Sequence, residues 1–148
     1  MIRTQKRMVL CITLLCLILT FIWGNSLLSA GASQAFSDWV KRLLSIAVTG
    51  EEPAAKGSGL LRKFAHFTEF SALGMCLCWL MGMLKRHRAW GILLGGLAAG
   101  IDETIQIFVP GRGPGLLDVG IDTMGVITGI ILLTLGHNFI RKKKLSGG

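Results

Sequence analysis

The side chains that could do chemistry gather in three short segments, each at the end of a long apolar run. They are a histidine, five acids, a glutamine and three bases: Arg62, Lys63, His66, Glu69, Asp102, Glu103, Gln106, Arg112, Asp118 and Asp122. Imidazole and carboxyl groups transfer protons or bind metal ions, and basic groups hold anions such as phosphate. Charges beside apolar runs usually carry function, because burying them in a membrane costs free energy.

Two spacings indicate how these groups are positioned. Arg62, His66 and Glu69 are separated by four and then three residues, so they share one face of a helix. The stretch from Asp102 to Asp122, DETIQIFVPGRGPGLLDVGID, surrounds a turn at positions 110–115 in which two prolines and three glycines oppose helix formation. The apolar runs on either side of this turn therefore form antiparallel helices, whose acids meet on the side that also holds Arg62.

The elements that must carry these groups are membrane helices. Apolar residues make up 51% of the 148-residue chain and charged residues 16%, and four runs approach the roughly 20 residues that span a bilayer. We predict an all-α polytopic membrane protein, a single domain over 1–148, with four transmembrane helices and an interfacial amphipathic helix between the first two. The predicted membrane helices cover about 8–28, 63–84, 90–109 and 116–136, the amphipathic helix about 34–48, and a flexible linker 49–59.

Basic residues predict the orientation. The side with the N-terminus, the 85–88 turn and the C-terminal tail carries ten lysines and arginines, and the other side carries six. Both termini are therefore expected in the cytoplasm, with the polar groups facing outward. Because the basic residues flank apolar runs, the net charge of +8 indicates topology and not nucleic-acid binding.

The first half of the chain leaves alternatives open. The first apolar run is either an uncleaved helix, which its length favours, or a cleaved signal peptide with a site near Ala30-Gly31-Ala32. The amphipathic face is that of Phe36, Trp39, Val40, Leu43 and Leu44, and it fits a membrane interface or, as the alternative, a partner protein. The four cysteines lack zinc-site spacing, so we expect free thiols.

Three uses of the polar groups remain open. They could join helices through hydrogen bonds; they could bind a metal through His66, Glu69 and one or two aspartates; or they could catalyse a reaction. Asp118 could also simply complement its helix dipole, and Arg112 could be a solvated loop charge. The predicted catalytic groups are His66, Glu69, Asp102 and Asp118. The predicted ligand-binding groups are Arg62, Lys63, Glu103, Gln106, Arg112 and Asp122.

The acids outnumber the bases in this set by five to three, so with His66 neutral its net charge is minus two. Protonated carboxyls, a protonated His66 or a bound cation could absorb the excess. No residue pattern identifies a cofactor, and none fixes a third metal ligand. Two GxxxG motifs, Gly96 to Gly100 and Gly125 to Gly129, predict close helix packing and make a homo-oligomer one use of these faces.

Taken together, these motifs resemble the VanZ-like family of small bacterial membrane proteins. The resemblance lies in Lys63-x-x-His66-x-x-Glu69-Phe70, in Asp102-Glu103-x-x-Gln106-x-Phe108-x-Pro110-Gly111-Arg112, in Asp118-x-x-x-Asp122-x-x-Gly125-x-x-x-Gly129, and in Asn25-Ser26. Two positions depart from it, because the family usually has a tyrosine at Phe70 and an asparagine near Asp122.

The resemblance implies a four-helix protein of the bacterial cytoplasmic (inner) membrane, whose namesake is associated with resistance to teicoplanin. From it and the residues we expect an outward-facing pocket that binds a lipid headgroup, a lipid-linked wall precursor or a partner protein. The alternative is a membrane-embedded hydrolase or transferase that uses His66 and the clustered carboxylates. A third reading, a proton- or ion-coupled transporter, fits four short helices poorly.

Overall fold

The computed structural model describes residues 2–50, 60–112 and 115–146, and within these ranges it is all-helical, with no strand. The predicted linker at 49–59 lies outside the described residues from position 51 onward. Gly50, with φ 73°, ends the helix before it in the left-handed conformation that glycine adopts readily. The helices are α1 Ile2–Ser26, α2 Ala30–Thr49, α3 Leu60–Met83, α4 Ala89–Ile107 and α5 Leu116–Ser146.

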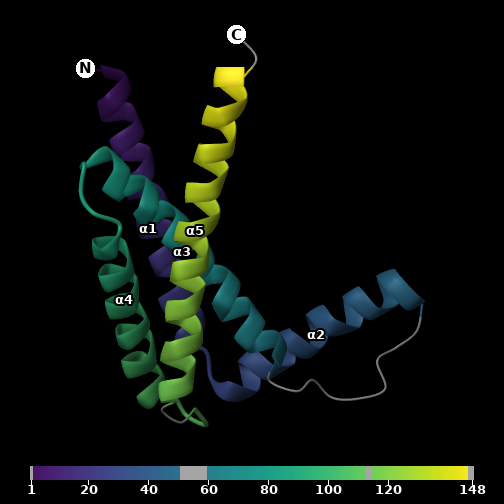
Figure 1. Ribbon diagram of the computed structural model, residues 1–148. Helices are drawn as coiled ribbons and strands as arrows, with labels where there is room; N and C mark the ends of the chain where they lie inside the picture. The colour runs from purple at the N-terminus through teal and green to yellow at the C-terminus, as the bar shows by residue number, and fades with distance from the viewer. Residues whose placement is uncertain (1, 51–59, 113–114, 147–148) are drawn as a thin grey trace.

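Helices α1, α3, α4 and α5 pack along one another as a bundle, and α2 projects away from it at one end (Figure 1). The two termini and the turn between α3 and α4 lie at the opposite end. The C-terminal ends of α1 and α4 therefore meet the N-terminal ends of α3 and α5. This arrangement places the three polar segments of the sequence at one level.

The helix ends differ from the sequence expectation mainly in the basic tails. Helix α1 begins at Ile2, against an expected start near residue 8, and α5 continues to Ser146, against an expected end near residue 136. Arginine, lysine and glutamine are good helix formers, so a polar tail can extend an apolar helix into water. The other ends differ from those expected by no more than four residues.

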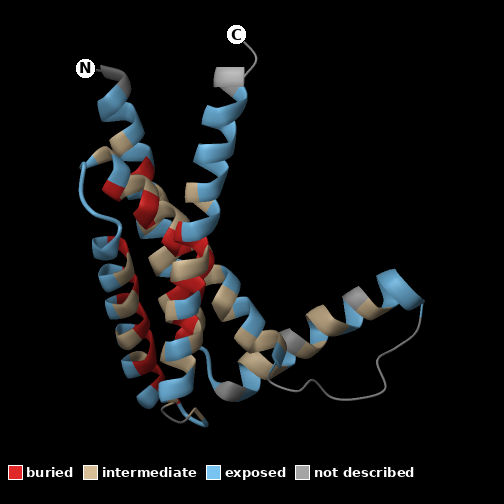
Figure 2. Ribbon diagram, in the orientation of Figure 1, coloured by how far each residue is buried: buried red, intermediate tan, exposed pale blue. Residues whose placement is uncertain are grey.

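Among the described residues, three helices are long and apolar enough to cross a membrane: Thr4–Ser26, Leu60–Met83 and Leu116–Lys143. Helix α4 does not meet the same criterion, because its 19 residues include Asp102, Glu103 and Gln106. Large apolar side chains are exposed along the outside of the bundle, while buried residues line its inner faces (Figure 2). This pattern suits a protein surrounded by lipid, and the chain is a helical membrane protein.

The core is centred on a close crossing of α3 and α5. A Cβ added to Gly129 would lie 1.9 Å from the backbone oxygen of Ser71, and one added to Gly125 would lie 2.6 Å from that of Phe67. On α3, a Cβ at Gly74 would lie 2.2 Å from the Val126 oxygen. The GxxxG motif of α5 therefore packs against α3 of the same chain. The α4 motif is more open, since nothing lies within 4 Å of a Cβ added at Gly100.

Helix α1 belongs to this core. Ile22 is fully buried, and Trp23 donates its indole N–H to the Ala98 carbonyl of α4 at 3.4 Å. The Cys11 thiol donates to the Cys76 carbonyl of α3, with 3.6 Å between the sulfur and the oxygen. All four cysteines are free, as expected. These contacts make α1 part of the bundle.

Candidate functional site

A polar layer lies at the end of the bundle away from the termini, where four helix ends meet. Helices α1, α3, α4, α5 and the turn after α4 all contribute to it. We define the layer as Asn25, Ser26, Arg62, Lys63, His66, Glu69, Asp102, Glu103, Gln106, Arg112, Asp118 and Asp122. It contains every predicted site residue and two that were not among them.

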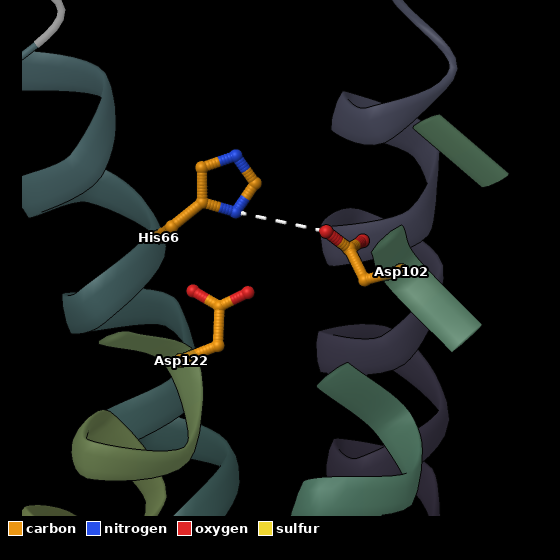
Figure 3. A group of neighbouring side chains, drawn as sticks. All are labelled: His66, Asp102 and Asp122. Atoms are coloured by element: carbon orange, nitrogen blue, oxygen red, sulfur yellow. Dashed lines mark ion pairs between the residues drawn. The ribbon is translucent and has the colours of Figure 1, made fainter. Parts of the chain in front are cut away.

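At its centre, His66, Asp102 and Asp122 come from three different helices and point into one space (Figure 3). Each offers a ligand atom, and these atoms all lie within 4.8 Å of one another. His66 Nδ1 is 3.9 Å from Asp102 Oδ2, which exceeds a hydrogen-bond distance. The Asp102 and Asp122 side chains are buried, with 0% and 3% of each residue exposed. We call these three residues the His-Asp-Asp cluster.

Asp102 is held in place by an amide from its own helix. Gln106 Nε2 donates to Asp102 Oδ2 at 2.8 Å, and the same amide nitrogen is 3.3 Å from the Ser26 hydroxyl oxygen of α1. All three residues are buried. Because Gln106 lies one turn beyond Asp102, the helix itself sets this contact. The link to Ser26 then ties the end of α1 to the cluster.

Asn25 forms a second connection between α1 and the layer. Its side-chain Nδ2 donates to Glu69 Oε1 at 3.0 Å, and its backbone oxygen accepts from Arg112 Nη2 at 3.4 Å. One residue of α1 therefore contacts an acid of α3 and the arginine of the α4–α5 turn. Glu69 lies on the predicted face with Arg62 and His66, but it accepts a hydrogen bond from Asn25 and not from a member of the cluster.

The remaining acids make contacts of their own. Glu103 Oε1 accepts from the backbone N–H of Gly115 and so fastens the turn to α4. Asp118 lies in the first turn of α5 and pairs with Lys63 at 3.4 Å, with 42% of the Lys63 side chain and 28% of the Asp118 side chain exposed. Asp102 and Glu103 face different partners, as their adjacent positions on a helix require.

Within the part of the chain that the structure describes, five buried polar atoms of the layer have no hydrogen-bond partner. They are His66 Nδ1, Glu69 Oε2, Asp102 Oδ1, Arg112 Nε and Arg112 Nη1. A buried polar group without a partner costs roughly 1–3 kcal/mol, so native proteins rarely keep several together unless a ligand satisfies them. The layer therefore contains polar groups that a water molecule or a ligand could satisfy.

A small cavity of about 10 Å³ opens beside the cluster, with room for one water molecule or ion. Its wall is mixed in charge and comes from α3, α4 and α5: Arg62, Lys63, His66, Gln106, Asp118, Ile121 and Asp122. Burial, and then the positive charge of nearby Arg62, lowers the pKa of the Arg112 guanidinium, although arginine stays protonated in proteins. The charges of Asp102 and Glu103 act in the opposite direction, so cationic and acidic side chains lie close together here.

Asn25 and Ser26 were not selected as site residues from the sequence, although both belong to the layer. A signal was present, because these polar residues end the first apolar run at the level where the acids were expected. They were also part of the family resemblance. What the sequence lacked was the position of α1 against α4, which brings Ser26 to Gln106.

The fold and the layer define a class: an all-helical membrane protein with a buried polar layer at one end of its bundle. Within this class, the sequence model of the VanZ/LLP1 family matches residues 8–137. The chain therefore belongs to the VanZ/LLP1 family, which confirms the resemblance seen in the motifs. No curated protein and no solved structure matches the chain.

Proposed function

We propose that this VanZ-like protein binds the anionic headgroup of a membrane lipid or lipid-linked wall precursor in its polar layer, at the outer face of the cytoplasmic membrane. A contribution to teicoplanin resistance would follow from occupying or altering such a precursor. The proposal also includes α4 as a fourth membrane span. At a rise of 1.5 Å per residue its 19 residues cover about 28 Å, close to the thickness of a hydrocarbon core.

The observation that carries the proposal is the unsatisfied Arg112. Its Nη2 reaches the Asn25 carbonyl, while Nε and Nη1 are buried and have no partner. A guanidinium presents its donors as a planar fork that matches phosphate and carboxylate oxygens. Arg62 and Lys63 lie on the wall of the adjacent cavity, which also holds Asp118 and Asp122, and Arg62 is near Arg112. An anion entering here would meet these cationic side chains beside two carboxyl groups.

An apolar groove on the bundle supports a lipid as the source of that anion. It has a volume of about 420 Å³ and is formed by α1, α3 and α4. Trp23 and Ile101 line it. Ile101 directly precedes Asp102 of the polar layer, and Trp23 lies two residues before Asn25. A headgroup at Arg112 would therefore have space for an acyl or prenyl chain along the same face.

Helix α2 supports the same placement. Trp39 and Leu43, on its predicted apolar face, are exposed, as are Ile46 and Val48. Helix α2 leaves the bundle at the level of the polar layer (Figure 1). An exposed apolar face at this level suits a helix lying in the membrane interface, where it would border the entrance to the layer.

The enzymatic alternative gains less support. Of the four predicted catalytic groups, Asp118 pairs with Lys63 and Glu69 with Asn25, so only His66 and Asp102 face each other. Within the described residues, no arrangement provides both an activated nucleophile and donors for a developing negative charge. We therefore base the proposal on binding.

The test measures binding of the purified protein in detergent to a polyprenyl phosphate, with the uncharged polyprenol as the headgroup control. We expect Arg112→Ala to weaken binding of the phosphate by about tenfold, or 1.4 kcal/mol, and to leave the weak binding of the polyprenol unchanged. Lys142→Ala, which removes a positive charge from the exposed end of α5, is the matched control and should bind like wild type.

In cells, wild-type protein should raise teicoplanin resistance while vancomycin susceptibility stays the same, and Arg112→Ala should remove the protection at equal membrane levels. If Arg112→Ala binds the phosphate as tightly as wild type does, the headgroup proposal is wrong. If binding is lost and teicoplanin protection persists, the resistance role is wrong and the binding role stands.

A further inference from the structure

The His-Asp-Asp cluster has the geometry of an incomplete coordination sphere. One imidazole and two carboxylates converge from α3, α4 and α5, and their ligand atoms lie within 4.8 Å of one another. Ligands bound about 2.1 Å from a tetrahedral ion are about 3.4 Å apart, so the 3.9 Å between His66 Nδ1 and Asp102 Oδ2 needs to shorten by roughly 0.5 Å. The other distances between ligand atoms are at most 4.8 Å and must shorten by up to about 1.4 Å, so binding requires the side chains to move toward the ion.

Two unpartnered atoms point independently to a ligand. Asp102 is fully buried, yet its Oδ1 has no hydrogen-bond partner, and neither does His66 Nδ1. Both side chains face the same space as Asp122 (Figure 3). A cation in this space would give His66 Nδ1 the partner that it lacks, and Asp102 could bind the ion through Oδ2 alone or through both oxygens.

Charge balance selects the kind of ion. Two carboxylates and one neutral imidazole carry a charge of minus two, which one divalent cation neutralises. A neutral complex avoids the cost of a net charge at membrane depth. Imidazole nitrogen favours Zn²⁺ and its neighbours among the transition metals over Mg²⁺ or Ca²⁺, which prefer oxygen-only sites.

The surroundings resemble those of a built metal site. Gln106 donates to Asp102 Oδ2, the carboxylate oxygen that lies 3.9 Å from His66 Nδ1, and so orients this carboxylate. Such contacts behind a ligand fix its orientation and commonly change metal affinity when removed. The adjoining cavity of about 10 Å³, lined in part by Arg62 and Lys63, leaves room for a fourth ligand such as water or an anionic oxygen.

We propose that His66, Asp102 and Asp122 bind a divalent transition-metal ion of the Zn²⁺ type, with a fourth coordination position open to the cavity. The site would hold its ion whether or not a lipid is bound, so it goes beyond the headgroup proposal. An anionic headgroup held by Arg112 could supply the fourth ligand. The proposal is tested without lipid, and its failure therefore leaves the headgroup proposal intact.

The experiment titrates ZnCl2 into metal-stripped, full-length protein in detergent by calorimetry and measures bound zinc after gel filtration by mass spectrometry. Wild type should bind about one ion per chain. His66→Gln and Asp122→Asn should each weaken binding by more than about 100-fold, and Gln106→Leu, which acts through Asp102, by about 10-fold to 100-fold. Rescue by Gln106→Asn is not expected, because the shorter amide cannot reach the carboxylate.

Asp38→Asn is the matched control. It is the same isosteric change at an acid of α2, outside the polar layer. It should bind zinc within about twofold of wild type, since Asp38 is not a ligand. If Asp38→Asn weakens binding as much as Asp122→Asn does, the acids attract cations without forming a site, and the proposal is wrong.

A second measurement covers the case in which a ligand variant does not fold. Co²⁺ bound by a histidine and two carboxylates in a four-coordinate site gives intense visible absorption bands, whereas Co²⁺ in water is octahedral and pale. Wild-type protein with CoCl2 should show these bands, and ZnCl2 should remove them by competition. If wild type shows no such bands and retains no zinc through gel filtration, the metal site does not exist.

Discussion

The same two helices, α3 and α5, meet in two regions of opposite character. At their crossing, Gly125 and Gly129 lie directly against backbone oxygens of Phe67 and Ser71, and Val126 is fully buried. About one turn toward the polar end, His66 and Asp122 face each other across a space, and neighbouring polar atoms have no partner. At the crossing the two helices touch, whereas in the polar layer their side chains are held apart.

The difference shows how the second region can exist. Helices that touch through glycine cannot move closer, so the crossing sets the separation of α3 and α5 along their length. The polar side chains one turn away are then held at that separation and cannot collapse onto one another. The crossing should therefore determine stability, and the polar layer should determine function at some cost in stability.

The largest expected effect is that of a methyl group at the crossing. Gly129→Ala places a Cβ 1.9 Å from the Ser71 oxygen, so α3 and α5 must separate. We expect a loss of at least about 3 kcal/mol, with little folded protein, because overpacking against backbone cannot be relieved by a rotamer change. Thermal unfolding in detergent, followed by gel filtration, measures it.

Gly100→Ala is the control, because nothing lies within 4 Å of the added Cβ. It should leave the melting temperature unchanged or slightly higher, since alanine favours helix over glycine. Equal destabilisation by the two substitutions would contradict the assignment of the crossing to α3 and α5 and would indicate that α4 packs through its own GxxxG motif.

The next effect should separate function from stability. Asp102→Asn removes a fully buried charge while keeping the size of the side chain and an acceptor for Gln106. In metal-stripped protein we expect the stability to rise by about 1 kcal/mol and teicoplanin protection to be lost. Thermal unfolding and susceptibility at matched membrane levels test both. If Asp102→Asn protects against teicoplanin as well as wild type does, the buried acids have a structural role only.

The features that could be predicted from sequence are those set by long-range pattern. The apolar runs at 63–84 and 90–109 required helices, and the short turns between the last three runs required antiparallel neighbours. These two facts alone bring His66 and Asp102 to one level. The all-helical fold, the family and a polar layer near the α4–α5 turn could therefore be predicted from the sequence alone.

The features that could not be predicted depend on helix rotation and on partner choice. Asp118 and Asp122 are four residues apart, so on a helix their directions differ by only about 40°. That small angle puts Asp122 in the buried cluster and Asp118 at the exposed rim beside Lys63. Likewise, GxxxG marks a face for close packing without naming the helix that packs on it.

A smaller loss of stability is expected where α1 closes the layer. Asn25→Ala removes the donor to Glu69 Oε1 and leaves both oxygens of this acid without a partner. We expect a cost of about 1–2 kcal/mol in the free energy of unfolding. Thr104→Ala is the matched control, because its exposed hydroxyl bonds only within α4, to the Gly100 carbonyl. A cost no larger than that of the control would mean that Glu69 finds another donor.

The smallest effect on stability should come from the rim of the layer. Lys63 and Asp118 are 3.4 Å apart, but the side chains are 42% and 28% exposed, and such pairs are worth at most about 1 kcal/mol. Lys63→Gln should therefore lower the stability by about 0.5 kcal/mol at low salt and less at high salt. Lys63 also lines the cavity, so binding of a polyprenyl phosphate should weaken more than stability does. If Lys63→Gln changes the stability and the binding of the polyprenyl phosphate by equally small amounts, Lys63 belongs only to the rim of the layer. The anion site would then consist of Arg62 and Arg112.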